Sequence, residues 1–498
     1  MKVTLISPYP DITAFGLRTL SAHLRAAGFK TRLLFLPDPF GDDFVDDPEN
    51  RYPASVMNQL VALCEGSQLI GVTLMTNFFD GASQITRSIK GGLGSVPVIW
   101  GGVHPTIRPD ECMEIADMVC VGDGEDALLE LTKKMAAGQD YSGTPNLWVK
   151  RGGEVIKNPL SPLPRDLDIY PAPDYSMEDH FVLVDGDIKP LDHDIMERFL
   201  KKGTVSGMLG KTGYQTMTSR GCPYACTYCI NDTVNEMYGG KGKLRWRSVG
   251  HVMEELSWAR QNMPYVDFIW ISDDEFFARK LEDIREFCVQ YKEKIGVPFS
   301  CLVSPLTVSE DKMGLLVDAG LVYVQMGVES GSARMQELYR RKNMNNTRMI
   351  KAMRIINSFK DKMAPPSYDF LLDAPEETDA DRIESLRLIA DIPKPFRLQP
   401  FRLILYPGTQ LHKEAMDQGL IKDERAEIYR KTYTMREPTY LNLLITLAKG
   451  GKMPGPLLKA LVSKPVAGTL NSQIMRPFIK WLYILLRGGY HLAKATLG

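Results

Sequence analysis

Apolar runs and helical patterns alternate over the first 140 residues of the chain. Apolar runs of strand length lie at 2–7, 31–36, 69–74, 97–100 and 117–122. Patterns with helical spacing lie between them, at 16–28, 54–64, 80–92 and 125–138. This order predicts an α/β domain over 1–140, a doubly wound parallel sheet of the Rossmann type covered by helices on both faces. A ligand of such a domain binds at the carboxyl ends of the strands.

The alternation weakens between residues 141 and 205. The stretch NLWVKRGGEVIKN predicts a hairpin that turns at Gly152-Gly153. The stretch that follows, LSPLPRDLDIYPAPDYS, is rich in proline, which is typical of a connecting segment. We therefore expect residues 141–205 to form a linker.

The alternation returns and continues to about residue 412. Six strands are predicted at 214–219, 266–272, 298–304, 322–330, 367–373 and 401–406. Helical patterns separate them at 248–263, 280–294, 309–319, 331–357 and 378–391. Six βα units predict a partial (βα)6 barrel of the TIM type over 206–412, with its site at the carboxyl ends of the strands. Residues 413–498 are expected to form a helical C-terminal region.

Three of the chain's eight cysteines share one loop after the first predicted barrel strand. The stretch SRGCPYACTYCIND contains Cys222, Cys226 and Cys229. Thiolates suit iron–sulfur clusters or zinc, but no second zinc half-site follows at a suitable spacing. An ordinary four-iron cluster takes four cysteines. Three cysteines would leave one iron without a protein ligand, and such an open position is where a small molecule can bind and react.

The spacing C-x3-C-x2-C, with aromatic Tyr228 before the last cysteine, resembles that of the radical S-adenosylmethionine (SAM) enzymes. The resemblance implies that the three cysteines hold a [4Fe–4S] cluster whose fourth iron binds SAM. One electron then cleaves SAM to a 5′-deoxyadenosyl radical that abstracts hydrogen from carbon. An electron donor of the flavodoxin or ferredoxin type is implied as a partner.

Later blocks extend the resemblance to the branch of this family with an N-terminal cobalamin-binding domain. These blocks are WISDDEFF (270–277), MGVESGS (326–332), LLDAPEET (371–378) and LYPGTQL (405–411). By this resemblance Tyr228 packs near the adenine of SAM and Glu329 contacts SAM. Arg247 is a weaker candidate for the SAM carboxylate, while Asp273 and Asp274 either position cofactor or substrate or have a capping role.

The first domain carries a modified form of a cobalamin-binding pattern. The loop DITAFG (11–16) resembles D-x-H-x-x-G, with Asp11 and Gly16 in place and Thr13 at the histidine position. Because threonine cannot replace imidazole as a metal ligand, we expect cobalt to lack a histidine from this loop. The other cofactor-binding positions that the resemblance indicates are Thr73, Gly101, Gly102, His104, Gly122 and Gly124. His104 is expected to contact the corrin or its side chains rather than the metal. The alternatives are a domain that lost cobalamin or one that binds another nucleotide-like ligand.

The net charge of −1 hides an uneven distribution, because residues 439–498 contain eight Lys and Arg and no Asp or Glu. Within this tail, RPFIKWLYILLR (476–487) has an apolar run too short to span a bilayer, and its basic flanks fit a helix in the membrane interface. The alternative is a helix packed on the barrel. Nucleic acid is not expected as a partner, since apolar side chains outweigh a polar basic face. The few, unevenly spaced cysteines indicate a reducing, cytoplasmic location.

Together these patterns predict a cobalamin-dependent radical SAM enzyme that methylates an unactivated carbon of a hydrophobic, lipid-like or isoprenoid-like substrate. It would be cytoplasmic, with peripheral contact at the inner face of the membrane. One alternative is a radical SAM cyclase or ring-rearranging enzyme without methyl transfer. Another is a cobalamin-responsive or redox-responsive binding protein whose cluster is structural or a sensor.

Overall fold

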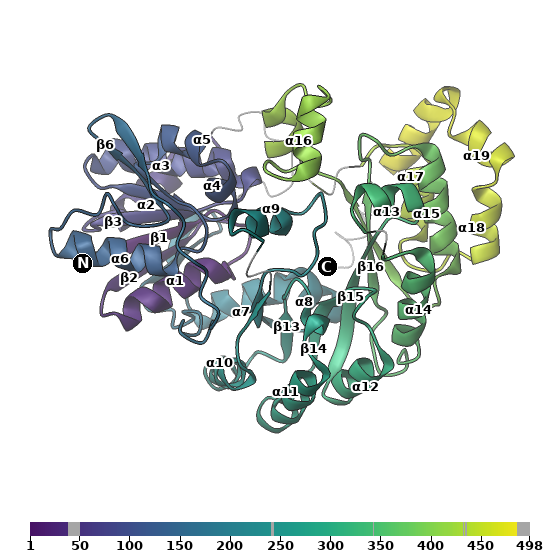
Figure 1. The fold of residues 1–498 in the computed structure, drawn as a ribbon, viewed down its shortest axis with the longest axis horizontal. Coiled ribbons are helices and arrows are strands. Elements are labelled where there is room, and N and C mark those ends of the chain that lie inside the picture. The colour runs from purple at the N-terminus through teal and green to yellow at the C-terminus, as the bar shows by residue number, and fades with distance from the viewer. Residues whose placement is uncertain (38–49, 241–243, 342, 432, 434–435, 486–498) are drawn as a thin grey trace.

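Two sheets organise the chain (Figure 1). The computed structural model describes residues 1–37, 50–240, 244–341, 343–431, 433 and 436–485. A nine-stranded sheet is built from the first 190 residues, and a six-stranded sheet from residues 213–402. Helices follow the second sheet at the C-terminal end. The predicted α/β class, with a doubly wound domain before a partial barrel and a helical C-terminal region, is confirmed.

The centre of the first sheet is parallel. Its strands are β1 (Lys2–Ser7), β2 (Lys30–Phe35), β3 (Leu69–Thr73), β4 (Val98–Gly101) and β5 (Met118–Cys120). Its helices are α1 (Phe15–Ala26), α2 (Ala54–Cys64), α3 (Phe79–Leu93), α4 (Val103–Ile107), α5 (Pro109–Ile115) and α6 (Glu125–Ala136). The strand order β5-β4-β3-β1-β2 changes direction at β1, and such a switch point opens a crevice at the strand ends.

Residues 147–190, expected within a linker, extend this sheet at both edges. The strands are β6 (Leu147–Arg151), β7 (Glu154–Lys157), β8 (His180–Val184) and β9 (Asp187–Pro190). β6 and β7 form the predicted hairpin beside β5, whereas β8 and β9 pair beside β2. The linker expectation followed the prolines, which lie in the strand-free segment between the two pairs. The domain boundaries themselves stay a prediction. α7 (His193–Lys202) and α8 (Thr204–Leu209) then lead to the barrel.

Six parallel strands form an open barrel. They are β10 (Gly213–Thr216), β13 (Phe268–Ile271), β14 (Phe299–Val303), β15 (Leu321–Glu329), β16 (Ser367–Leu372) and β17 (Arg397–Arg402). Its helices are α10 (Val249–Asn262), α11 (Leu281–Lys294), α12 (Glu310–Asp318), α13 (Ala333–Leu338), α14 (Asn346–Asn357) and α15 (Asp379–Asp391). After β10, the short strands β11 (Ser219–Arg220) and β12 (Arg245–Trp246) form an antiparallel ribbon, and α9 (Ile230–Met237) lies between them in the chain.

The sixth barrel strand begins earlier than predicted, at Arg397 rather than at residue 401. Pro400 lies inside the strand and interrupts the apolar pattern that a strand prediction relies on. Proline is tolerated there because β17 is an edge strand, where a missing backbone N–H need not break a ladder. The run 403–406, predicted as part of the strand, is irregular and leads to the next helix.

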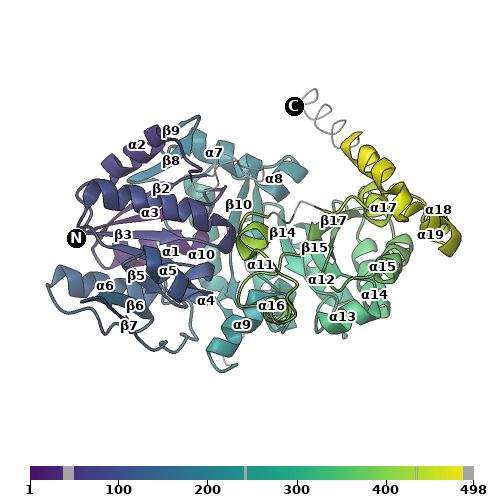
Figure 2. The same ribbon diagram turned by 90° about the horizontal axis from the view of Figure 1, so that it is seen from above.

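The C-terminal region consists of short helices beyond the barrel. They are α16 (Gln410–Asp417), a π-helical turn η3 (Arg425–Tyr429), α17 (Tyr440–Ala448), α18 (Gly455–Leu461), α19 (Lys464–Leu470) and the turn η4 (Gln473–Met475). A last helix covers 476–485 and extends away from α18 and α19 (Figure 2). The rest of the tail, 486–498, lies outside the described residues. In the part of the chain that is described, no helix is long and apolar enough to cross a membrane.

Candidate active site

The three cysteines lie between β11 and α9. Cys226 is 7% exposed, while Cys222 and Cys229 are partly exposed. Among the described residues, no three Cys, His, Asp or Glu side chains converge as ligands of one metal ion. A single structural zinc ion would need such convergence. A four-iron cluster would not, because each of its cysteines ligates a different iron, so the assignment of these three cysteines to a cluster stays a prediction.

Neighbouring strand ends and the C-terminal region hold the cysteine loop. Asp273, at the end of β13, accepts hydrogen bonds from the backbone N–H and hydroxyl of Thr218 and from the backbone N–H of Ser219. Asp273 is fully buried, so these bonds shape the start of the loop. Within the loop, the carbonyl of Thr227 accepts a hydrogen bond from the backbone N–H of Leu411, 3.1 Å away.

A buried arginine that the sequence analysis did not single out lies against the loop. Arg341 is 7% exposed and donates to the carbonyl of Gly327 at 2.7 Å. Its Nη1 lies 3.6 Å from Cys226 Sγ and 3.4 Å from the Tyr228 hydroxyl. Arg341 sits in a run of three basic residues, 340–342, which in a sequence is typical of a solvated surface.

Glu329 joins this group from the end of β15. Its φ of +66° is a left-handed conformation that residues other than glycine seldom adopt, and such strain clusters at functional sites. Burial raises the pKa of Glu329, against the opposing effects of the Arg341 charge and a hydrogen bond from Tyr228. The structure thus brings the predicted pair Tyr228 and Glu329 together, with Arg341 between them and Cys226.

Two further predicted residues have protein partners. Asp274 accepts a hydrogen bond from Asn231 of α9 at 3.0 Å, close behind Cys229 in the chain. Arg247 is buried, forms an ion pair with Glu255 and donates to the Met217 carbonyl at 3.0 Å. These bonds engage the Arg247 guanidinium within the protein, and its contact with SAM stays a prediction.

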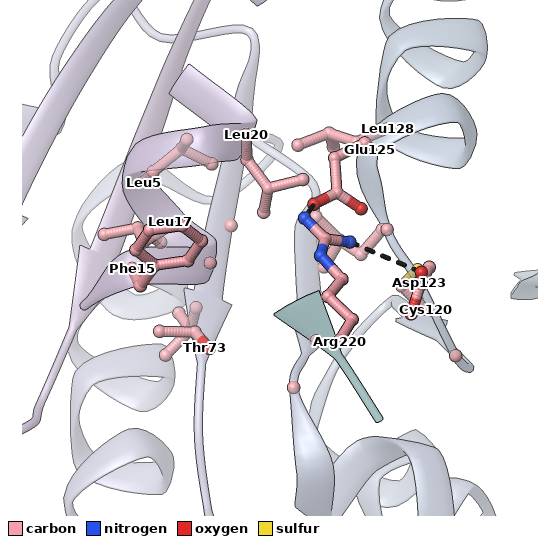
Figure 3. A pocket seen from close by; sticks show the side chains of 18 of the residues that line it. Leu5, Phe15, Leu17, Leu20, Thr73, Cys120, Asp123, Glu125, Leu128 and Arg220 are labelled. Atoms are coloured by element: carbon pink, nitrogen blue, oxygen red, sulfur yellow. Dashed lines mark hydrogen bonds and ion pairs between the residues drawn. The ribbon is translucent and has the colours of Figure 1, made fainter. Parts of the chain in front are cut away.

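A cavity of about 280 Å³ opens at the carboxyl ends of β1, β3, β4 and β5 (Figure 3). Its walls are largely apolar, with Leu5, Leu17, Leu20, Ile99 and Leu128 among them. Six of the predicted cobalamin-binding residues line it, namely Gly16, Thr73, Gly101, Gly102, Gly122 and Gly124. Met217 and Arg220 close it from the barrel side.

Gly102 is needed for the shape of this cavity. Its φ is +104°, and a Cβ built on it would lie 2.8 Å from the Leu74 carbonyl and 3.0 Å from Thr73 Oγ1. A larger residue would therefore be strained and would also push against the wall.

Asp11 and Thr13 do not line the cavity. Thr13 donates to one Asp11 carboxylate oxygen through its backbone N–H at 2.9 Å and through its hydroxyl at 2.6 Å. This loop therefore closes on itself. None of the described residues that line the cavity is a histidine.

His104, expected to contact the corrin, lies elsewhere. It is fully buried, packs edge-on against Phe79 and Tyr429, and is 3.4 Å from Glu111. Burial lowers the pKa of His104, so it favours the neutral imidazole. The short helix α4 begins directly after Gly102 and turns His104 away from the cavity. His104 adjoins the glycine pair in the sequence, but its side chain packs on Tyr429 of the C-terminal region.

Ion pairs join the cavity to the strand that carries the cysteine loop. Arg220 of β11 pairs with Glu125 at 2.5 Å and with Asp123 at 3.3 Å (Figure 3). Arg245, its partner in the β11–β12 ribbon, also pairs with Asp123, at 2.9 Å. Cys222 follows Arg220 by two residues. The sequence analysis missed these pairs, because nothing in a single sequence links positions about 95 residues apart.

The doubly wound domain has a cavity that faces the barrel, and the barrel has three cysteines after its first strand. Together these features define an enzyme with two cofactor sites. Comparison with known families agrees. Residues 216–389 match the radical SAM superfamily and residues 1–132 match the B12 binding domain. The chain belongs to the radical SAM enzymes that carry an N-terminal B12-binding domain.

Known proteins resemble the chain over most of its length. An uncharacterized methyltransferase of Pyrococcus horikoshii is 26% identical over 360 residues, covering 71% of this chain and 70% of that protein. Cytidylyl-2-hydroxyethylphosphonate methyltransferase of Streptomyces wedmorensis is 24% identical over 84% of this chain and 80% of its own length. The methyltransferase TsrM of Kitasatospora setae, solved with cobalamin and a [4Fe–4S] cluster, superposes with a TM-score of 0.63 at 18% identity, covering 84% of this chain and 78% of TsrM.

The cofactors of this family are cobalamin, a [4Fe–4S] cluster and SAM, and the residues present fit them. The glycine-lined cavity is slightly smaller than the roughly 300–1,000 Å³ of sites that enclose a drug-sized ligand, so a molecule as large as cobalamin would enter it in part. The cysteine loop offers three thiols, of which Cys226 contacts the buried Arg341, and the partly buried Glu329 carboxyl lies at the end of β15. This donor set suits a cluster and the charged amino acid part of SAM.

Proposed function

We propose that the chain is a cobalamin-dependent radical SAM methyltransferase that methylates an unactivated carbon. The observation that carries this proposal is the Arg220 contact, because one short strand borders the cobalamin cavity and continues into the cysteine loop. Arg220 lines one cofactor site, and Cys222, two residues later, belongs to the other. This closeness favours one reaction that uses both cofactors. The relatives named as methyltransferases support the same reading.

The proposed roles follow from chemistry and position. Cys222, Cys226 and Cys229 hold the cluster, while Arg341 and Glu329 bind the carboxylate and amino groups of SAM. When bound, the cluster and SAM supply hydrogen abstraction from carbon, and cobalamin supplies methyl transfer. The protein's own part is to bind, orient and shield these groups.

A carboxyl group on β16 gives the substrate a polar contact in this proposal. Asp369 Oδ2 accepts a hydrogen bond from Gln325 at 2.8 Å, while its buried Oδ1 has no hydrogen-bond partner among the described residues. Burial raises the pKa of Asp369, Glu329 raises it further and Arg341 lowers it. Asp369 lies beside Gly327 in the β15–β16 ladder, and Arg341 donates to the Gly327 carbonyl, so Asp369 lies near the group proposed to bind SAM. A substrate with a hydroxyl or amine would satisfy Oδ1. Asp369→Asn should raise KM more than it changes SAM cleavage; an unchanged KM would contradict this contact.

A hydrophobic substrate taken from a membrane surface completes the proposal. It is supported by the exposed apolar side chains between 474 and 485 and by the basic residues of 439–498, a span without Asp or Glu. Lipid-like molecules partition into bilayers, so an enzyme acting on them gains by resting on that surface.

The test uses the anaerobically purified protein with cobalamin, a reductant and SAM labelled in its methyl group. Lipid extracts of cells lacking the gene serve as substrate, and products are examined by mass spectrometry. We expect 5′-deoxyadenosine together with a product that carries the labelled methyl group. A product with the same number of carbon atoms as the substrate would indicate cyclisation or rearrangement instead of methyl transfer. A complete absence of 5′-deoxyadenosine would indicate a binding protein.

A further inference from the structure

The last described helix presents an uncovered apolar face. Ile474, Phe478, Trp481 and Leu485 follow one another at intervals of four, three and four residues, which places them on one side of a helix. Each is at least half exposed, and Ile474 is 89% exposed. The rings of Phe478 and Trp481 stack with centroids 6.1 Å apart.

A different face attaches this helix to the protein. Ile479 is 3% exposed and packs in the main core, with Leu482 and Tyr483 packed against that core. The Tyr483 hydroxyl lies 3.4 Å from the hydroxyl of Thr446 on α17. The exposed row is therefore a second apolar face on a helix that is already anchored.

This concentration of apolar surface is unusual within the molecule. Of the eighteen large apolar side chains that are exposed among the described residues, five lie between 474 and 485. Single exposed apolar residues need no explanation, but a contiguous patch marks a binding surface.

The charge around the helix selects the kind of partner. Arg476 and Lys480 lie one turn apart on the helix and line a groove that also contains Arg382 and Glu437. Glu437 pairs with Arg402, and neither Arg476 nor Lys480 forms an ion pair within the described part of the chain. No acidic residue follows position 438 in the sequence. A second copy of this chain would bring like charges together, whereas an anionic surface would attract these groups.

We propose that this face binds an anionic phospholipid bilayer. The apolar row enters the boundary between head groups and acyl chains. Arg476 and Lys480 leave the helix on other sides than this row, and their long side chains reach toward the phosphates. The inference deepens the proposed hydrophobic substrate, but it does not depend on methyl transfer.

The test is flotation of the full-length holoenzyme with phosphatidylcholine vesicles, made with or without phosphatidylglycerol. We expect flotation with the anionic vesicles that falls as salt rises. The double variant Phe478→Glu/Trp481→Glu should reduce it about tenfold or more, which is at least about 1.4 kcal/mol of binding energy. Arg476→Glu/Lys480→Glu should lower binding to the level seen with neutral vesicles.

Val289→Glu is the matched control, because Val289 is 65% exposed on α11, and it should float like the wild type. Circular dichroism and 5′-deoxyadenosine formation in detergent should be equal in all variants. The proposal is overturned if the wild type does not float, or if the aromatic substitutions leave flotation unchanged. A wild-type dimer that these substitutions dissociate, without vesicle binding, would also overturn it. Flotation needs no turnover, so a failed methyl-transfer assay leaves this result independent.

Discussion

The cavity of the first domain and the cysteine loop of the barrel differ in what builds them. The cavity exists where side chains are missing, as at Gly102, and its walls are mostly apolar. The cysteine loop is bordered by titratable groups, with the buried Arg341 beside Cys226 and the partly buried Glu329 at the end of β15. A site of the first kind selects a ligand by shape, and a site of the second kind by charge and thiolate chemistry.

Arg220 marks the boundary between these two regions. It lines the apolar cavity and pairs with Glu125, which is 5% exposed, yet it belongs to the strand that leads to Cys222. The comparison therefore predicts that each site can be damaged alone, while damage at the boundary uncouples two intact sites.

The largest effect should come from Cys226→Ala. We expect iron and sulfide content to fall and 5′-deoxyadenosine formation to drop about 100-fold or more, or roughly 2.7 kcal/mol in the barrier. Cobalamin absorbance should stay unchanged, since the cavity is intact. Cys288→Ala, at a buried cysteine of α11, is the control and should keep its iron. A Cys226→Ala protein that retains iron and turnover would refute the assignment.

Gly102→Val should weaken cobalamin binding and leave the iron–sulfur cluster intact. Gly102 has φ +104° and ψ −167°, a backbone conformation that is essentially restricted to glycine and costs other residues on the order of 1–3 kcal/mol. The added Cβ would also meet the Leu74 carbonyl. Cobalamin affinity, measured by absorbance titration, should fall about tenfold or more while cluster content is retained. Gly91→Ala is the control, because a Cβ at Gly91 meets nothing within 4 Å. Normal cobalamin binding by Gly102→Val would show that the ligand does not use this cavity.

Arg220→Gln should leave both cofactors bound but weaken their cooperation. The substitution leaves Glu125 without its partner, and breaking a buried ion pair costs about 3–5 kcal/mol at full burial, less here because Arg220 is partly exposed. The measured quantity is methylated product per 5′-deoxyadenosine, which should fall several-fold. Adding Glu125→Gln should restore part of the ratio, because the double variant removes both charges. An unchanged ratio in Arg220→Gln would show that the Arg220 ion pairs do not couple the two cofactor sites.

The smallest effect on activity should come from Glu275→Gln. Burial raises the pKa of Glu275 to about 7, against a lowering hydrogen bond from the Thr307 hydroxyl. Because the folded-state pKa exceeds the unfolded value, Glu275 contributes stability that is full below about pH 4.5 and is lost as the pH rises through about 7. Thermal unfolding between about pH 5 and about pH 8 should therefore show a flatter stability profile in the variant. Identical pH profiles of stability in the wild type and Glu275→Gln would contradict the raised pKa of Glu275.

Local patterns predicted the elements well, because parallel strands buried on both faces appear as unbroken apolar runs. The cysteine loop was also visible in the sequence, because its three candidate ligands lie within eight residues. Contacts between distant segments were not visible. Arg341 approaches Cys226 across 115 positions, and the edge strands β6 to β9 need partner strands before their short patterns have meaning.

The contact of η3 with the first domain has a consequence for how the protein is made. Arg425 pairs with Glu111 at 2.6 Å, and Tyr429 packs on His104. Arg425 follows Glu111 by 314 positions in the chain. At ~5–20 residues per second a ribosome needs roughly 15–60 s to deliver this covering segment. During that interval the nascent domain exposes Phe79 and His104 to the surroundings. Chaperone binding to ribosome-held chains should accordingly peak before residue 425 emerges and decline once it has.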